Sequence, residues 1–205
     1  TRWGVRLEYI RIGSLDVSRF TIGGNPFSGF SHQSAEMDLR MKRYFTTQQI
    51  KRVLHEAEQL GINTLIARAD HHIMRLLMEY WDEGGSLRWI AQTCPELGSI
   101  EAGVRNAIVG GAEACYVHGG VMDHLLAHDQ LDEAVQAVEM IRQAGMPAGI
   151  AGHDPNVFRW AESNLDVDFY MCSYYNSSSR DNQAAHVPGR PEWFLERDRA
   201  IMTDS

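Results

Sequence analysis

The feature that most constrains the fold is a regular alternation of two kinds of segment along the 205 residues. Short apolar runs rich in Val, Ile, Phe and Tyr are followed by longer segments in which apolar residues recur every three or four positions. The first pattern predicts strands, and the second predicts amphipathic helices. Because they alternate, we predict an α/β fold in which helices cover a parallel sheet.

Six strands are expected after an N-terminal hairpin around residues 12–16. The clearest helix begins at Thr46, whose hydroxyl can cap it while Gln49 reaches back, and it stops at Gly61, a residue suited to a left-handed turn. The predicted strands are residues 19–23, 63–67, 88–92, 114–118, 148–151 and 168–172, and the other predicted helices are residues 72–82, 99–109, 131–144, 156–164 and from 192 onward.

The strand count predicts the architecture. Repeated glycine stops and the absence of a GxGxxG turn favour a (β/α)8 TIM-barrel type over a flatter, doubly wound sheet. A complete barrel of this type needs about 250 residues, and about six β/α units are present here. We expect a single domain over residues 1–205 whose exposed strand edges are covered by further C-terminal residues or by a second copy in a homodimer or higher homo-oligomer.

Charge and cysteine content restrict the partners. The formal net charge is −8, and Lys and Arg are interspersed with Asp and Glu, a pattern that disfavours nucleic acid and anionic membranes as partners. A small-molecule substrate fits this composition better. Three widely spaced cysteines do not make a disulfide framework, and no signal sequence is evident at the N-terminus. We therefore expect a cytoplasmic protein.

Polar residues follow every predicted strand. In parallel α/β folds the C-terminal strand ends converge on one mouth, where chemistry takes place. The candidate residues, in chain order, are Asn25, Arg68, Asp70, Cys94, Glu96, His118, His153, Tyr174 and Asn176.

Four of these residues are candidate ligands of a zinc-like divalent metal: Asp70, His118, His153 and Cys94. Three protein ligands and an open position are typical of a catalytic zinc site. For each histidine taken alone, a hydrogen-bonded polar residue in a cleft is the competing interpretation. Cys94 is alternatively a nucleophile or a small buried hydrophobic residue.

The remaining candidates are assigned to substrate binding. Arg68 would orient an anionic substrate, or it would serve only as the charge partner of Asp70. Asn25, Glu96, Tyr174 and Asn176 complete the predicted substrate-binding set.

Several segments resemble the aldo-keto reductase superfamily: RIGSLDVSRFTIGGNPFSGF at the start, then EAEQLGINTLIARAD, ACYVHGG and FYMCSYYN. The resemblance implies a barrel whose base is closed by a hairpin, an active-site histidine at His118, and hydride transfer from NADPH. The rest of the family's tetrad is missing, because Ile66 or Ala67 stands in the place of its aspartate, Cys94 in that of its lysine, and no tyrosine matches. NADPH is therefore not expected as the cofactor.

Three functions remain open at this point. The leading hypothesis is a metal-assisted hydrolase or lyase that acts on a small polar or anionic substrate, with the metal lowering the pKa of its bound water. The second is a divergent NADPH-dependent aldo-keto reductase. The third is a non-catalytic protein that binds a ligand in the same mouth.

Overall fold

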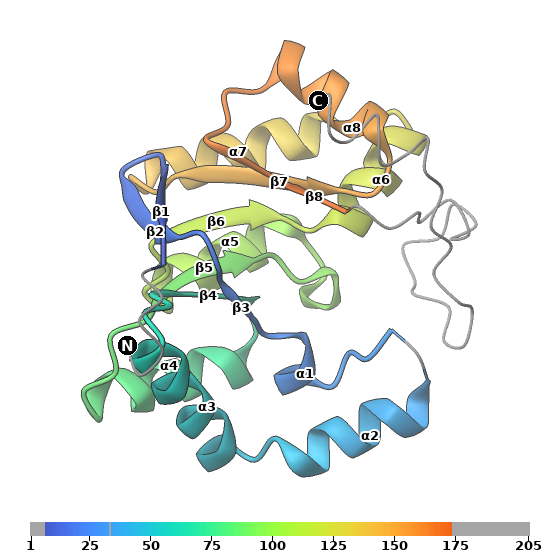
Figure 1. The fold of residues 1–205 in the computed structure, drawn as a ribbon. Coiled ribbons are helices and arrows are strands. Elements are labelled where there is room, and N and C mark those ends of the chain that lie inside the picture. Colours follow the sequence, from blue (N-terminus) through green and yellow to red (C-terminus); the bar gives the residue numbers. More distant parts are fainter. Residues whose placement is uncertain (1–6, 33, 174–205) are drawn as a thin grey trace.

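The centre of the molecule is a curled sheet of six parallel strands that follow one another in sequence order (Figure 1). The computed structural model describes residues 7–32 and 34–173. Within them the fold is α/β, with an open half-barrel of the TIM-barrel type and an N-terminal antiparallel hairpin, as predicted. The strands are β3 (Ile22–Gly23), β4 (Thr64–Arg68), β5 (Arg88–Gln92), β6 (Ala114–Val117), β7 (Ala148–Gly152) and β8 (Phe169–Cys172).

Helices follow the strands much as the periodicity predicts, and the N-cap of α3 is the one expected. The Thr46 side chain accepts a hydrogen bond from the backbone N–H of Gln49, at 3.3 Å. The helix predicted from residue 192 lies outside the described residues. The predicted helices are α3 (Thr47–Gln59), α4 (His71–Asp82), α5 (Ile100–Val109), α7 (Asp132–Gln143) and α8 (Pro155–Asn164), whereas α1 (Asn25–Ser28), α2 (Ala35–Tyr44), the 3-10 turn η1 (Pro95–Leu97) and α6 (Gly119–Ala127) were not predicted.

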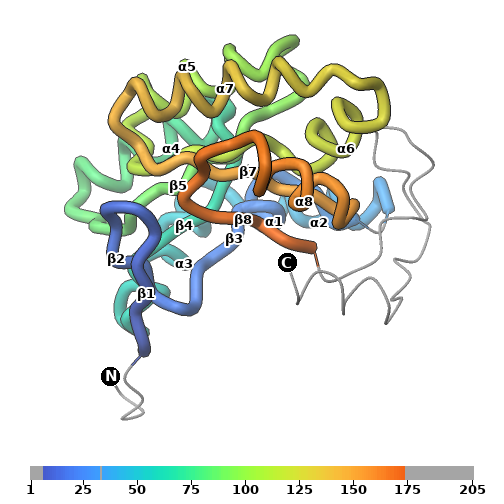
Figure 2. The backbone as a smooth tube through the Cα atoms, turned by 90° about the horizontal axis from the view of Figure 1, so that it is seen from above, coloured from blue at the N-terminus to red at the C-terminus, as the bar shows by residue number. Residues whose placement is uncertain are grey.

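Alternate residues of each strand face opposite sides of the sheet. Along β4, Leu65 and Ala67 belong to the large core between the strands and the helices. The intervening Ile66 packs in a smaller cluster with Ile90 and Tyr116, on the inner face of the curl. Figure 2 shows α4, α5 and α7 together on the outer side of the strands. The inner face therefore leads to the strand ends.

The hairpin of β1 (Tyr9–Ile12) and β2 (Leu15–Ser18) covers the N-terminal ends of the strands. Ser18 N donates to Asn63 Oδ1 at 2.8 Å, and Arg88 Nη1 donates to the Asp16 carbonyl at 2.8 Å. Asn63 and Arg88 lie directly at the starts of β4 and β5, and Val17 is buried against the inner cluster. The hairpin therefore packs across the N-terminal ends of the strands, opposite the ends that carry the predicted site residues.

The sheet has two edge strands, β3 and β8, among the residues that the structure describes. In the same part of the chain, no helix combines the length and the apolar character that crossing a bilayer requires.

Candidate functional site

The parallel register brings the polar strand ends together on the inner face. Arg68 of β4 is the register partner of Gln92 on β5, and Gln92 is that of Tyr116 on β6. Tyr116 donates its hydroxyl hydrogen to Gln92 Oε1 at 2.8 Å. The residues just beyond this row lie at the strand ends, which the sequence predicts as the mouth that holds the site.

Arg68 is the cationic centre of the mouth. Its guanidinium lies 4.5 Å from the ring centroid of Phe30, a contact that gains from the cation–π attraction. Nε donates to Asp70 Oδ2 at 3.3 Å, and Nη2 donates to Glu96 Oε2 at 2.6 Å. The ion pair with Asp70, one of the two predicted roles of Arg68, is thus present.

His118 follows β6 and caps the helix α6. Its Nδ1 accepts a hydrogen bond from the backbone N–H of Gly120 at 3.1 Å, which assigns the ring proton to Nε2. Its own backbone N–H donates to the buried Thr93 hydroxyl at 3.0 Å. Burial, with the positive charges of His153 and Arg68 adding to it, lowers the pKa of His118 to about 4. At neutral pH the ring is therefore uncharged and a hydrogen-bond donor through Nε2.

His153 follows β7 and is held by Asp123, a residue that the sequence did not indicate. Asp123 Oδ2 lies 2.7 Å from His153 Nδ1, while Oδ1 accepts the backbone N–H groups of His153 and Asp154 at 3.0 and 3.2 Å. Because an ionised carboxylate only accepts, Nδ1 carries the proton and Nε2 is the basic nitrogen. The pair has the geometry of a histidine base oriented by an acid.

The two histidines lie close together because the start of α6, at Gly119, closely approaches the end of β7. A Cβ atom at Gly119 would meet His153 Cε1 at 3.0 Å and the Gly152 backbone nitrogen at 3.3 Å. The charge of His153 also contributes to the lowered pKa of His118. Adjacent strands thus present one histidine that donates and one that can take up a proton.

Cys94 is buried beside this cluster, with an exposed fraction of 2%. Burial raises the pKa of its thiol to about 11, although the nearby Arg68 acts in the other direction. The side chain is therefore a protonated thiol at neutral pH, which matches the interpretation as a small buried residue. A thiol lacks the nucleophilicity of a thiolate.

The other predicted site residues lie apart from the two histidines or outside the described residues. Asn25 begins α1, and its Nδ2 lies 3.1 Å from His32 Nε2. Asp70 caps α4, where its Oδ1 accepts the Ile73 N–H at 2.9 Å. Tyr174 and Asn176 lie outside the described residues, so their assignment to substrate binding stays a prediction.

The predicted metal ligands do not form a ready ligand set in the described part of the chain. No group of three or more His, Cys, Asp or Glu side chains there is arranged to hold a metal ion. Asp70 is engaged by Arg68 and by α4, the Nε2 of His118 bears a proton, and Cys94 keeps its own. Ligation by these residues and His153 stays a prediction, and it would require rearrangement of the mouth.

Comparisons with known proteins bear on the fold. No protein-family model matches the sequence, and no curated protein matches it at a significant level. Among solved structures, the aldolase QR15 is similar with a TM-score of 0.51 and 13% identity over 66% of this chain. The match spans 65% of the QR15 chain. An aldolase/citrate lyase family protein from Burkholderia cenocepacia gives a TM-score of 0.43 and 14% identity over 75% of this chain and 78% of that chain.

These comparisons correct the resemblance to aldo-keto reductases, which is wrong. The fold is similar to that of the aldolase QR15, which is not an aldo-keto reductase. The physical reason is that the shared motifs, a hairpin below the strands, a Gly-Ile-Asn turn and a histidine after a strand, serve the construction of a β/α barrel. At 13% identity the similarity to QR15 likewise establishes the fold alone.

Proposed function

We propose that this protein is a lyase that cleaves a carbon–carbon bond in a small hydroxy acid bound at the strand-end mouth. One observation carries the proposal. His153 is set up by Asp123 as a base, and the neighbouring His118 is neutral and presents an N–H group. Retro-aldol cleavage requires these two capacities at once, because a hydroxyl must lose its proton while charge develops on a carbonyl oxygen.

The proposed reaction uses only side chains of the chain. His153 Nε2 removes the proton of a hydroxyl that lies β to a carbonyl. The bond between the hydroxyl-bearing carbon and the α-carbon then breaks, its electrons forming an enolate, and the first fragment leaves as an aldehyde or ketone. His118 Nε2–H donates to the enolate oxygen, and His153 returns the proton to the α-carbon. Arg68 attracts the negative charge of the acid group.

The similarity of the fold to the aldolase QR15 supports this as the reaction class to test first. A divalent metal would polarise the carbonyl oxygen if it were bound. The described side chains provide no ready ligand set for such an ion, so the proton transfers are assigned to His153 and the hydrogen bond to the enolate oxygen to His118. Elemental analysis of the purified protein tests the predicted metal.

The decisive experiment is the substitution Asp123→Asn. Asn keeps an acceptor for the backbone N–H groups of residues 153 and 154 but presents an NH₂ group to His153 Nδ1, which moves the ring proton to Nε2. We expect wild-type protein to release a carbonyl product from a panel of β-hydroxy carbonyl acids, trapped as hydrazones. The variant should lose at least about 100-fold in kcat, the usual contribution of a general base.

Asp129→Asn is the matched control, since Asp129 lies in the exposed turn after α6 with a φ of 55° that Asn tolerates. It should retain wild-type activity. Equal rates for Asp123→Asn and wild type would contradict the proposal. If the wild type turned over only esters or phosphate esters, the hydrolase hypothesis would stand instead, and binding without any turnover would favour the non-catalytic one.

A further inference from the structure

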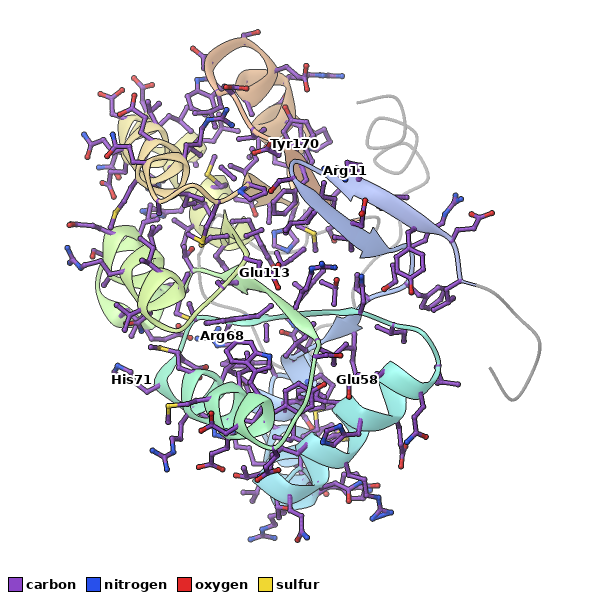
Figure 3. The ribbon with its side chains drawn as sticks, turned by 90° about the vertical axis from the view of Figure 1, so that its left-hand side faces the viewer. Arg11, Glu58, Arg68, His71, Glu113 and Tyr170 are labelled. Carbon is purple, nitrogen blue, oxygen red and sulfur yellow. The ribbon has the colours of Figure 1, made fainter. Side chains whose placement is uncertain are left out.

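Arg68 holds two carboxylates, and they are bound to the protein in very different ways. The Arg68 side chain is only 9% exposed, and Figure 3 shows it among the strands, whereas His71 projects from α4 at the periphery. Phe30 covers one face of the guanidinium, and Asp70 and Glu96 take hydrogen bonds from its edges. The cation is thus paired with groups of the chain itself on one face and at two edges.

Asp70 is a fixed partner. One of its oxygens accepts from Arg68 Nε and the other caps α4 through the Ile73 N–H, and its side chain is 25% exposed. Removing it from Arg68 would also uncap a helix, which costs about 1 kcal/mol. Asp70 therefore stays in place when other groups around Arg68 change.

Glu96 is the more exposed of the two partners. Its side chain is 58% exposed, although it makes the shorter contact with Arg68. It stands on η1, a single 3-10 turn without a side-chain N-cap, which ends at Gly98 with a φ of 83°. Its Oε2 lies 2.6 Å from Arg68 Nη2, so a single hydrogen bond joins this exposed side chain to the guanidinium. The group on Arg68 Nη2 is therefore a carboxylate in a charge-assisted hydrogen bond.

We infer that Glu96 occupies the place of a substrate carboxylate on Arg68 and swings outward when the substrate binds. The inference rests on the proposed function, because it names the acid group by which the hydroxy acid is held. Glu96 would then be a built-in competitor: it keeps the cation paired in the empty site and is displaced by an equivalent group. The vacated position lies near His118, whose pKa the Glu96 charge affects.

The charge balance favours a carboxylate over a phosphate. Replacing Glu96 by a carboxylate keeps one negative charge on Nη2, whereas a phosphate dianion would add a second charge beside the fixed Asp70. A planar carboxylate also matches the guanidinium edge that Glu96 already uses.

The test measures binding without turnover. The Arg68 Nε–H signal and the backbone amides of ¹⁵N-labelled protein are followed by NMR during titration with lactate or with inorganic phosphate. Glu96→Gln removes the competing charge, so lactate should bind about fivefold tighter than to wild type, which is the factor for an ion pair worth about 1 kcal/mol. Phosphate should bind more weakly than lactate to this variant.

Two further variants complete the design. Glu101→Gln is the matched control, because Glu101 pairs with Arg105 on the exposed surface of α5 and should leave lactate binding unchanged. Arg68→Lys keeps the charge but loses the planar fork, so lactate binding should fall in both the wild-type and the Glu96→Gln background. The comparison of wild type with Glu96→Gln remains decisive even if Arg68→Lys does not fold.

Three results would overturn the inference: equal lactate affinity of wild type and Glu96→Gln, tighter binding of phosphate than of lactate, or no binding to either protein. The outcome is separable from that of the proposed function. If lactate binds as expected but no carbonyl product is ever released, the lyase proposal fails while the carboxylate exchange stands.

Discussion

At the scale of single residues, His118 shows how packing changes the chemistry of a side chain. A histidine ordinarily titrates near pH 6.5, but burial lowers the pKa of His118 to about 4. The hydrogen bond from the Gly120 N–H also favours the neutral ring, since it requires an unprotonated Nδ1. Both effects keep the imidazole neutral, which suits a hydrogen-bond donor and not a cationic acid.

This pKa shift predicts a pH-dependent stability. Between about pH 6.5 and pH 4 the unfolded chain binds a proton at His118 and the native chain does not. The contribution of the neutral His118 to the free energy of unfolding is therefore complete above about pH 6.5 and is lost as the pH falls to about 4. The full effect is at most about 3 kcal/mol. In His118→Asn the amide oxygen can still accept the Gly120 N–H, but the group no longer titrates.

Urea unfolding at pH 7 and pH 4.5 measures the effect. Wild type should lose about 1–3 kcal/mol more in the free energy of unfolding between these pH values than His118→Asn does. An equal loss for both proteins would mean that His118 titrates normally in the folded chain.

Residue types at the strand ends were predictable, but their partners were not. Arg68, His118 and His153 are where the sequence placed them, because each directly follows an apolar run that forms a buried strand. Asp123 was missed, since its role depends on a carboxylate of one helix meeting the turn after another strand. Cys94 was assigned to metal binding partly by position, and its burial could be known only from the packing.

At the scale of elements, α6 decides the geometry of the mouth. It supplies the N-terminal N–H group to His118 and the carboxylate to His153. Its sequence, GGVMDHLLA, begins with two glycines and is apolar on most sides, so no clear helical period marks it. The prediction therefore lacked both the helix and Asp123.

Gly119 offers a test of this arrangement. In Gly119→Ala the new Cβ would lie 3.0 Å from His153 Cε1 and 3.3 Å from the Gly152 nitrogen, so the imidazole must move. We expect kcat to fall at least tenfold in the hydrazone assay, because a base displaced by a few tenths of an ångström loses its alignment. The loss should exceed that expected from any change in thermal stability.

Gly23→Ala is a suitable control, because nothing lies within 4 Å of a Cβ at that position on β3 and its φ is not in the left-handed region. Full activity of Gly119→Ala with an unchanged His153 ring signal by NMR would show that the tight approach of α6 is not needed.

At the scale of the whole molecule, the open edges of the sheet bear on the oligomeric state. Strands β3 and β8 end the sheet within the part of the chain that the structure describes, and unpaired strand edges tend to associate. We predict that the 205-residue chain forms at least a dimer, which light scattering coupled to size-exclusion chromatography measures. A clean monomer across a concentration series from micromolar to millimolar would contradict this prediction.

The sequence by itself determined the strands, most helices, the parallel order and the end of the sheet that carries polar residues. These features follow from local periodicity, capping residues and glycine stops, which need no knowledge of distant contacts. The boundaries of β5 agree with the prediction, and α3 has its predicted Thr46 cap. A resemblance based on the same local motifs nevertheless named the wrong superfamily, because those motifs build a barrel and do not specify its chemistry.

Only the tertiary structure decided which polar groups act together. It joined Asp123 to His153 and placed Phe30 and Glu96 on Arg68. Such pairings depend on side chains that are 28 to 38 residues apart in the chain, and burial then sets their protonation. Distance and dielectric environment are properties of the packed molecule, so a site of this kind can be located in a sequence but its chemistry is determined only by the fold.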